Sequence, residues 1–419
     1  MTERQSGLYN ALTKSMIMID SDEYLQASKA HPQDFTRKRK MTFPDLIRFM
    51  ITRRKGSTQN ELEEYFDKIG AEKTMTQQAF SEARLKIKDT ALSMLYYGII
   101  PTMYESQCDT WNGYRVLAID GSKIALPDVD LLGRIYGTMG ADSSSPTAQA
   151  SICYDILNKV VVDALIEPLA VDERTMALRH IKNLDQSVRF EKELVIADRG
   201  YASFELIHGF NQEGLSYLLR VKRGFNADVD AQSQPDGIIT LHRAGYPDLP
   251  LRVIKFDLPS GETETLLTNL WDSNLTDEAF QALYFLRWPV EVKYDEVKNK
   301  LEIENFTGTS VLAIRQDFYA TMYLSNIAAA AFWDAQAAVD QERDGKENKY
   351  RYQVNVNHEI GVLKSRLIYA LTSPDPWPDV ERILLRLARR VCPIKSGRSP
   401  KRNKFPRRSK FHWNSRSNS

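Results

Sequence analysis

The sequence predicts an α/β protein: an α/β core that carries a β-rich insertion and follows an all-helical N-terminal domain. Between residues 115 and 223, continuous apolar runs alternate with helical patterns, which is typical of strands covered by helices on both faces. Residues 1 to about 108 have apolar positions at helical spacing. Residues 224–275 read as short strands separated by Pro and Gly.

With 419 residues, the chain is long enough for two or three domains. We expect a helical N-terminal domain, a first part of the core, the β-rich insertion, the rest of the core with C-terminal helices, and a basic tail. These segments are predicted at 1–108, 109–223, 224–275, 276–390 and 391–419.

The composition indicates a cytoplasmic protein. Apolar residues make up 42% and charged residues 26%, as in ordinary soluble proteins. No apolar run approaches the roughly 20 residues that span a bilayer, and "MTERQSGLYN" lacks a signal-peptide pattern, so we expect no membrane association. The three cysteines are far apart, which predicts reduced thiols. The six histidines are scattered, and with no CxxC pair this argues against a structural zinc site.

The net charge of +1 hides a strong asymmetry. From Lys395 to Arg416 the chain has nine Lys or Arg and no acid, which leaves 47 basic against 55 acidic residues elsewhere. Such segregation predicts a tail that binds a polyanion, and the aromatic residues among its bases favour DNA or RNA. A disordered solubilising tail is the alternative. The candidate DNA contacts in this tail are Arg407, Arg408 and Lys410.

Basic residues also flank a predicted N-terminal helix. "TFPDLIRFMITRRK" has helical spacing, and "TRKRK" and "RRKGS" place bases around it. A compact helical domain with a basic edge suits DNA binding, although many helical bundles have such edges.

Three acids in the core are candidate catalytic residues. "RVLAIDGSKIALPD" and "KELVIADRGYAS" are apolar runs that end in Asp120 and Asp198. In "YFLRWPVEVKYDEVKNK", steps of three, four and seven should place four polar residues on one helical face, and four apolar residues look like core positions. Pro289 should kink or restart this helix. The polar face is Tyr284, Arg287, Glu291 and Lys298, and the apolar positions are Leu286, Val290, Val297 and Leu301.

Three converging carboxylates repel one another unless they share a cation. Mg²⁺ (or Mn²⁺) takes such hard oxygen ligands and leaves room for phosphate oxygens and water. Two ions about 4 Å apart can activate a nucleophile and stabilise the leaving oxygen of a phosphodiester. Each element alone has another explanation: a strand that ends in Asp-Gly also occurs in phosphatases, and a solvated surface helix also carries mixed charge.

The combination resembles the DDE transposases of the insertion-sequence-4 family, whose mark is Tyr, two residues, Arg, three residues, Glu, six residues, Lys. Tyr284, Arg287, Glu291 and Lys298 keep every spacing, and Asp120 and Asp198 match the family's other two acids. The β-rich stretch before Glu291 also fits. The resemblance is good over roughly 110–310 and loose at both ends of the chain.

The resemblance implies a ribonuclease H-like core and a cut-and-paste transposase. Such a protein would bind the inverted-repeat ends of a transposon in double-stranded DNA, cut them by metal-dependent hydrolysis through a hairpin, and join them to target DNA. Synapsis implies a homodimer on DNA, associated with the bacterial nucleoid. Trp288 and Trp271 are candidates to stack on strained terminal bases, with ordinary packing as the alternative. A nuclease of the same fold and a silent DNA-binding protein are the rival interpretations.

Overall fold

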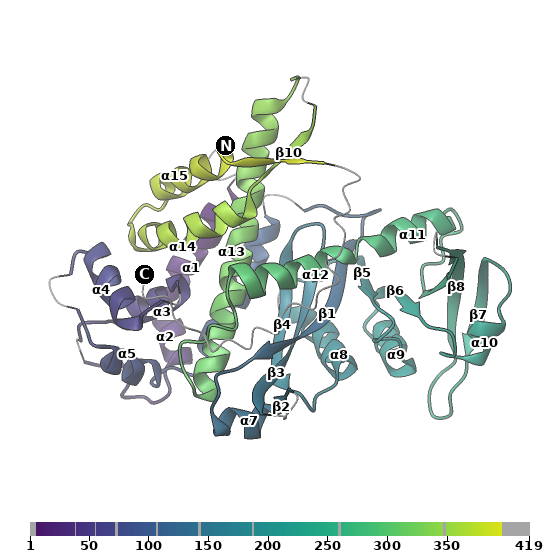
Figure 1. Ribbon diagram of the computed structural model, residues 1–419, viewed down its shortest axis with the longest axis horizontal. Coiled ribbons are helices and arrows are strands. Elements are labelled where there is room, and N and C mark those ends of the chain that lie inside the picture. Colours follow the sequence, from purple (N-terminus) through teal and green to yellow (C-terminus); the bar gives the residue numbers. More distant parts are fainter. Residues whose placement is uncertain are drawn as a thin grey trace. The chain divides into compact units, whose positions relative to one another are not determined.

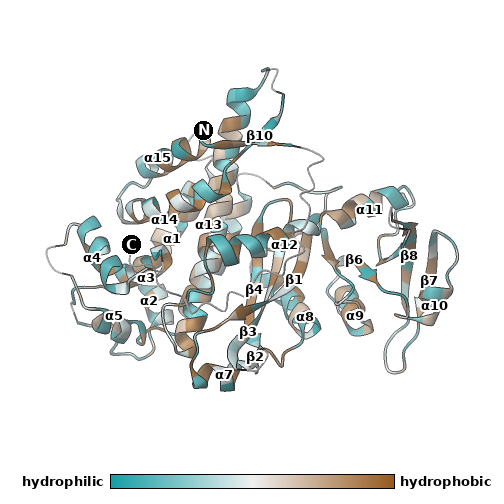
Figure 2. Ribbon diagram, in the orientation of Figure 1, coloured by the Kyte–Doolittle hydropathy of each residue, from teal (hydrophilic) through white to brown (hydrophobic). Residues whose placement is uncertain are grey.

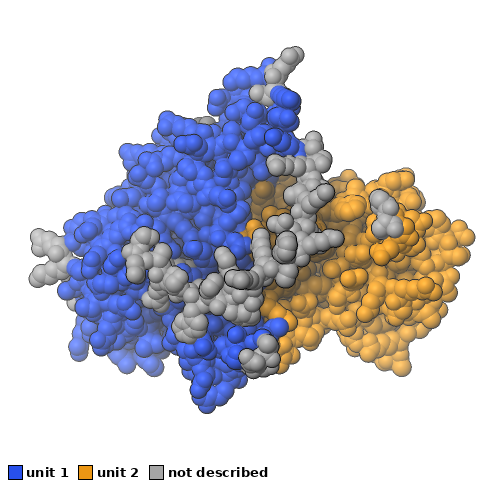
Figure 3. Space-filling model, in the orientation of Figure 1, with its two compact units in different colours: residues 1–107, 124–148, 296–419 blue, residues 108–123, 149–295 orange. Residues whose placement is uncertain are grey.

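The computed structural model (Figure 1) describes residues 6–37, 39–54, 56–71, 74–105, 108–140, 144–186, 188–258, 261–346 and 349–395. The chain forms two compact units (Figure 3). Unit 1 comprises residues 1–107, 124–148 and 296–419, and unit 2 comprises residues 108–123 and 149–295. Within the described ranges, no helix is both long and apolar enough to cross a membrane.

A nine-stranded sheet supplies most of unit 2. Its order is β2-β3-β1-β5-β6-β9-β8-β7, and β4 pairs with β3 as well. The strands are β1 (Arg115–Ala125), β2 (Thr138–Met139), β3 (Ser145–Asp155), β4 (Val160–Pro168), β5 (Glu193–Ala197), β6 (Ser216–Val221), β7 (Asp236–Leu241), β8 (Leu249–Asp257) and β9 (Thr263–Thr268). Of these, β2 and the ends of β1 and β3 from residues 124–148 are assigned to unit 1.

The central part of the sheet confirms the predicted ribonuclease H-like core. The order β4-β3-β1-β5-β6 has β1, β5 and β6 parallel. All five residues of β5 and the first five of β1 are buried, which explains their continuous apolar sequence. Figure 2 shows this concentration of hydrophobic residues in the strands.

The predicted β-rich insertion consists of β7, β8 and β9, with the short helix α10 (Ala227–Ala231) before them. These strands continue the same sheet, because β9 pairs antiparallel with β6, β8 with β9, and β7 with β8. The insertion therefore extends the edge of the core sheet.

Helices of unit 2 pack on the sheet and carry the candidate site. The helix α8 contacts β4 and α9, and α9 contacts β6. The helices are α8 (Glu173–Asn183), α9 (Phe204–Gln212), α11 (Asp277–Phe285) and α12 (Trp288–Asp295), with a 3₁₀ turn, η3 (Leu184–Gln186), after α8. Thr276 caps α11 by accepting from the amide of Ala279.

Unit 1 is mainly helical and is built around the 33-residue helix α13 (Val311–Arg343), which α1, α3 and α6 contact. The predicted N-terminal helices are α1 (Gly7–Ile19), α2 (Asp22–Ser28), α3 (Phe43–Thr52), α4 (Thr58–Lys68), α5 (Gln77–Arg84) and α6 (Thr90–Ile99), followed by the 3₁₀ turn η2 (Ile100–Tyr104). The remaining elements are α7 (Asp130–Tyr136), the π-helical turn η4 (Glu296–Lys300), β10 (Arg351–Val354), α14 (Val356–Thr372), α15 (Trp377–Ala388) and β11 (Val391–Ile394).

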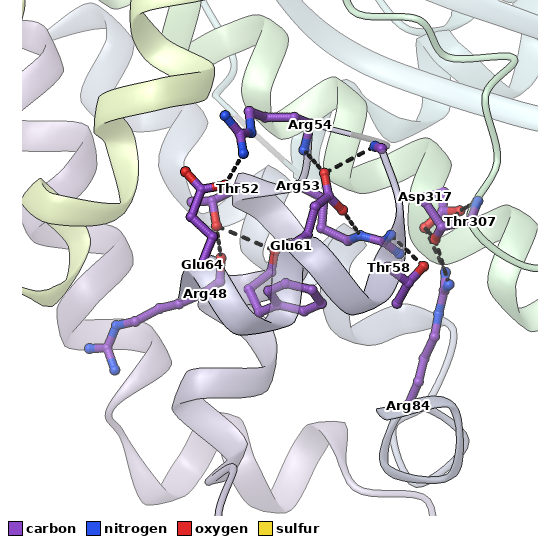
Figure 4. A network of polar contacts seen from close by, with 12 residues as sticks. Arg48, Thr52, Arg53, Arg54, Thr58, Glu61, Glu64, Arg84, Thr307 and Asp317 are labelled. Carbon is purple, nitrogen blue, oxygen red and sulfur yellow. Dashed lines mark hydrogen bonds and ion pairs between the residues drawn. The ribbon is translucent and has the colours of Figure 1, made fainter. Parts of the chain in front are cut away.

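Buried ion pairs connect the N-terminal helices with α13 (Figure 4). Arg84 donates to Asp317 at 2.6 Å, and both side chains are less than a tenth exposed. Asp317 also accepts from the backbone amide of Thr307 at 2.6 Å. The start of α1 is held similarly, because Asp334 accepts from the hydroxyl of Ser6 at 2.6 Å. These contacts tie the predicted N-terminal domain to C-terminal helices within unit 1.

Part of the predicted basic edge is used in these structural contacts. Arg53, from "RRKGS", is buried and pairs with Glu61 at 2.8 Å, and Arg54 pairs with Glu64 (Figure 4). The bases of "TRKRK" behave differently, since Arg37, Arg39 and Lys40 line a groove of about 920 Å³. Only this second run remains a candidate surface for DNA.

The segment predicted as a tail from residue 391 begins with β11, which pairs with β10. The tail residues Arg407, Arg408 and Lys410 lie outside the described residues.

Candidate active site

One of the predicted acids lies in a parallel strand, and another directly follows the neighbouring parallel strand. The pairing of β1 with β5 ends at Ala118 opposite Ile196, and Asp120 and Asp198 each lie two residues further on. Alternate residues of a strand face the same side, and neighbouring strands are about 4.8 Å apart. The register therefore puts Asp120 and Asp198 at matching positions along the two chain segments.

The prediction that Asp120 ends its strand was wrong. β1 continues through Gly121 to Ala125. Asp198 does follow the last residue of β5, as predicted.

The third acid, Glu291, is positioned by a break in the helix. α11 ends at Phe285 and α12 begins at Trp288, so Pro289 lies in the first turn of α12, where it needs no intrahelical partner. Arg287, in the break, donates to Glu291 at 2.7 Å. The hydroxyl of Tyr284 donates to Asp198 at 3.1 Å. Within the predicted motif, Tyr284 thus contacts Asp198, and Arg287 pairs with Glu291.

Arg287 is the charge that the three acids share. Its guanidinium pairs with Glu291 and also interacts electrostatically with Asp198 and Asp120. The side chain of Arg287 is 11% exposed, whereas that of Glu291 is 40% exposed. The cation is thus largely enclosed.

The pKa of Asp120 is raised from its ordinary 3.8 to about 6, mainly by burial, with smaller contributions from the charges of Glu291 and Glu173. Arg287 and the amide of Gly121 act in the opposite direction. The ionised form of Asp120 is therefore destabilised in the folded protein, and a further cation nearby would reduce this destabilisation.

Two hydroxyl groups donate to the backbone of Asp120. Its carbonyl oxygen accepts from Tyr294 on α12 at 2.9 Å and from Ser151 on β3 at 3.2 Å. Ser151 in turn contacts the buried His180 at 2.9 Å, and His180 pairs with Asp163 at 2.6 Å. These contacts join β1 to the helix that carries Glu291.

A second arginine lies near Asp198. Arg220 on β6 lies 4.0 Å from Asp198 and 3.0 Å from Glu264. Burial raises the pKa of Glu264, and Arg220 opposes this. The side chain of Arg174 donates to the carbonyl of Gly200, two residues after Asp198, at 3.0 Å. Sequence reasoning missed Arg220, and only its place on the strand after β5 could have indicated it.

Lys298 is placed differently from the other motif residues. It lies in η4, which belongs to unit 1, and the carboxylate that acts on it is that of Glu304. Burial lowers the pKa of Lys298, and Glu304 raises it. A π-helical turn does not follow the 3.6-residue repeat on which the shared face of Lys298 and Glu291 was predicted, and that shared face stays a prediction.

The predicted core positions of the motif are mostly correct. Val290, Val297 and Leu301 are buried, whereas Leu286, in the break, is only half-buried. Trp271 and Trp288 are 50% and 53% exposed, so neither is packed in the core.

The donor set fits a hard divalent cation, since carboxylate oxygens are the ligands that Mg²⁺ prefers. As the side chains stand, no three His, Cys, Asp or Glu residues of the described part of the chain are arranged to hold a metal ion. Glu291 is engaged by Arg287. A metal would have to take over Glu291 from this arginine.

Comparisons with known proteins identify the family. The model of the transposase DDE domain matches residues 111–327, just over half of the chain. A putative transposase, y4zB, of Sinorhizobium fredii (strain NBRC 101917 / NGR234) is 36% identical over 141 residues, which cover 30% of this chain and 39% of that protein. The chain thus matches about two fifths of that relative's length.

Among solved structures, the chain is similar to the piggyBac transposase in a cryo-EM structure of its synaptic complex with hairpin DNA. The TM-score is 0.48 at 11% identity, with 90% of this chain and 85% of that chain covered. The matched family residues contain Asp120, Asp198 and Glu291 together with the core that carries them. The chain belongs to the family of transposase DDE domains.

Proposed function

We propose that this protein is a cut-and-paste DNA transposase of the insertion-sequence-4 type. It binds the inverted-repeat ends of a transposon, cleaves them, and joins them to target DNA in the bacterial cytoplasm, where its substrate lies. The observation that carries the proposal is the ion pair of Arg287 with Glu291 at 2.7 Å, whose guanidinium also acts electrostatically on Asp120 and Asp198. With the register of the two strands and the helix that restarts at Pro289, this ion pair supports a common site for the three acids.

Asp120, Asp198 and Glu291 would hold Mg²⁺ or Mn²⁺. When bound, two such ions supply Lewis-acid activation of a water or hydroxyl and neutralise the leaving oxygen. The buried hydroxyls of Tyr294 and Ser151 keep the Asp120 backbone in place. Once Glu291 is a ligand, Arg287 is available for a DNA phosphate, which a guanidinium can hold with two hydrogen bonds.

Further residues near the acids suit DNA. Tyr284 and Arg220 flank Asp198, and Arg220 adds a second guanidinium for phosphate. The exposure of Trp288 and Trp271 suits stacking on the unpaired bases of a hairpin end. Lys298 would contact DNA from unit 1.

The N-terminal helices offer a second DNA surface. The groove in unit 1 is lined by the cations Arg37, Arg39, Lys40 and Lys86. Phosphate contacts of this kind position a protein on DNA without reading its sequence. Joining two transposon ends requires two copies of the chain, so we infer a homodimer on DNA.

The test is Asp198→Asn, assayed on the DNA that flanks the gene. Inverted repeats there would define the substrate. The variant should lose Mg²⁺-dependent cleavage of these ends and keep near-normal binding, because an amide cannot supply the anionic oxygen while the basic surfaces persist. Asp128→Asn, at an exposed position just before α7, is the matched control and should cleave normally.

Cleavage by Asp198→Asn at the rate of the unsubstituted protein would contradict the proposal. Cleavage without joining in a strand-transfer assay would favour a nuclease of this fold instead. Specific binding of the ends with no cleavage by the unsubstituted protein would favour a silent DNA-binding protein.

A further inference from the structure

We propose that His180 is a positioning residue for Asp120: with a hydrogen on both ring nitrogens, it directs the Ser151 hydroxyl to the main-chain carbonyl of this acid. This role rests on the proposed function and adds to it the buried pair of Asp163 and His180, which lies outside the motif. Asp163 lies on β4, His180 on α8 and Ser151 on β3, and all three belong to unit 2 together with Asp120.

A chain of hydrogen bonds runs from Asp163 to the backbone of Asp120, and the three side chains in it have no exposed surface. His180 Nδ1 lies 2.6 Å from Asp163 Oδ2, and His180 Nε2 lies 2.9 Å from Ser151 Oγ. The Ser151 hydroxyl donates to the carbonyl oxygen of Asp120 at 3.2 Å. Because these side chains are shielded from solvent, their polar atoms depend on protein partners for hydrogen bonds.

The number of hydrogens in this chain fixes who donates to whom. A serine hydroxyl has one hydrogen, and the carbonyl oxygen of Asp120 can only accept it. Ser151 Oγ must then accept from His180 Nε2, so Nε2 carries a hydrogen. Asp163 Oδ2 also accepts from the amide of Asn183 at 3.2 Å, which suits an ionised carboxylate, so Nδ1 is the donor in the other bond. All these bonds form together when the His180 ring is an imidazolium.

The charges in this pair agree with the hydrogen count. An ionised carboxylate without exposed surface is costly unless a positive charge lies beside it. An imidazolium at 2.6 Å makes the buried pair of Asp163 and His180 neutral as a whole. A neutral ring would leave the interior with a net negative charge.

The hydrogens on His180 therefore affect the backbone of Asp120. If Nε2 had no hydrogen, it would accept from Ser151, and the Asp120 carbonyl would keep only one of its two hydroxyl donors, that of Tyr294 at 2.9 Å. Groups that hold a metal ligand in place affect activity almost as strongly as the ligand itself. His180 thus acts on Asp120 through Ser151, from outside the metal site.

A purely structural role is the competing explanation. In that case the His180 ring is neutral, Ser151 donates to it, and the chain only joins α8 to the sheet. The two explanations differ in the hydrogens on the ring and in the effect of Ser151 on the rate of cleavage.

The first measurement is ¹⁵N NMR of the full chain with labelled histidine, in EDTA at about pH 7.5. Chemical shifts separate ring nitrogens with and without hydrogen, and His180→Gln identifies the signals of His180 among those of the six histidines. We expect a hydrogen on both nitrogens of His180 in the unsubstituted protein. In Asp163→Asn the ring should become neutral, with a hydrogen on Nδ1 alone, because an amide oxygen accepts without carrying a charge.

The second measurement is end cleavage at saturating Mg²⁺ by Ser151→Ala and Asp163→Asn, per folded molecule. Each variant removes the same hydrogen bond to Asp120, so kcat should fall about tenfold, the low end of the range for partners of metal ligands, while KM for DNA stays unchanged. The double variant should lose little more, because both changes act on one bond.

The matched control is Thr268→Val, which removes a fully buried hydroxyl from β9 of the same sheet. That hydroxyl also donates to a backbone carbonyl, that of Tyr217 at 2.6 Å. Thr268→Val should lower the melting temperature in EDTA and leave kcat unchanged.

The outcomes separate this role from the proposed function. A single protonated ring nitrogen on His180, or an unchanged kcat of Ser151→Ala, would overturn the positioning role while the proposed function stands. If Asp163→Asn does not fold, the unsubstituted protein and Ser151→Ala still decide between the two explanations. Absence of end cleavage by the unsubstituted protein would overturn the proposed function and the positioning role with it.

Discussion

Replacing Asp120 by Asn should stabilise the metal-free protein above neutral pH. The folded state raises the pKa of Asp120 from 3.8 to about 6, so the folded protein binds a proton more tightly than the unfolded chain does. The stabilisation from this proton is fully present below pH 3.8 and is lost as the pH rises through about 6. At pH 8 the folded protein therefore carries the full cost of an ionised, half-buried carboxylate.

The magnitude follows from the shift. About two pKa units at 1.36 kcal/mol each give a cost of about 3 kcal/mol at pH 8. At pH 4.5, where the unfolded chain is already mostly ionised, the same pKa difference gives a cost of about 1 kcal/mol. The free energy of unfolding of Asp120→Asn, relative to the unsubstituted protein, should thus rise by about 2 kcal/mol between pH 4.5 and pH 8. Asn keeps the size of the side chain, so packing changes little.

Urea unfolding in EDTA at five pH values between 4.5 and 8, followed by tryptophan fluorescence, measures this difference. Asp128→Asn, at an exposed position, should show no such pH dependence. Addition of Mg²⁺ should reverse the order at pH 8, because an ion that binds only the folded unsubstituted protein stabilises it by mass action. A difference between the two proteins that stays constant with pH would refute the reasoning, since the carboxylate would then be ionised without cost.

Three further predictions concern other contacts. Tyr294→Phe removes a hydroxyl that donates to the Asp120 carbonyl and should cost about 1 kcal/mol in urea unfolding; it should also slow end cleavage more than it weakens DNA binding, and equal loss of both would contradict a positioning role. Arg84→Met leaves the buried Asp317 without its guanidinium and should cost about 3–5 kcal/mol; the double variant with Asp317→Leu should recover part of this, and a cost below 1 kcal/mol would show the pair to be dispensable. Deleting residues 395–419 should lower affinity for all DNA and flatten the dependence of log affinity on log salt, because nine cations are lost; preference for transposon ends should persist, and an unchanged salt slope in titrations would favour a solubilising tail.

The strands of the core were predictable because parallel strands buried on both faces need continuous apolar sequence, as β5 shows. The position of Asp120 within its strand was not, since nothing local distinguishes a glycine that turns from one that allows a close neighbour. Gly121 is of the second kind. The close neighbour of Gly121 is Glu173, which lies 52 positions further along the chain.

The helix that carries Glu291 shows the same limit. The spacing of Tyr284, Arg287 and Glu291 predicted one face of one helix, but the chain breaks between α11 and α12 and changes to π-helical turns at η4. Pro289 signalled the break, and nothing in the sequence signalled η4. Tyr294 could have been found, because it is three positions after Glu291 and residues at this spacing are neighbours on a helix.

Arg287 and Glu291 make the contact that helical spacing predicts, although α11 and α12 are separate helices. Their ion pair joins residues four apart, and hydrogen bonds between residues three apart connect the two helices at Leu286, Arg287 and Val290. Tyr284, near the end of α11, donates to Asp198. The motif thus keeps its helical spacing and still reaches two different acids. Burial raises the pKa of Asp120, and the charge of Arg287 opposes this rise. A divalent ion bound to the same acids would have the same effect, so the ion and Arg287 would compete for Glu291.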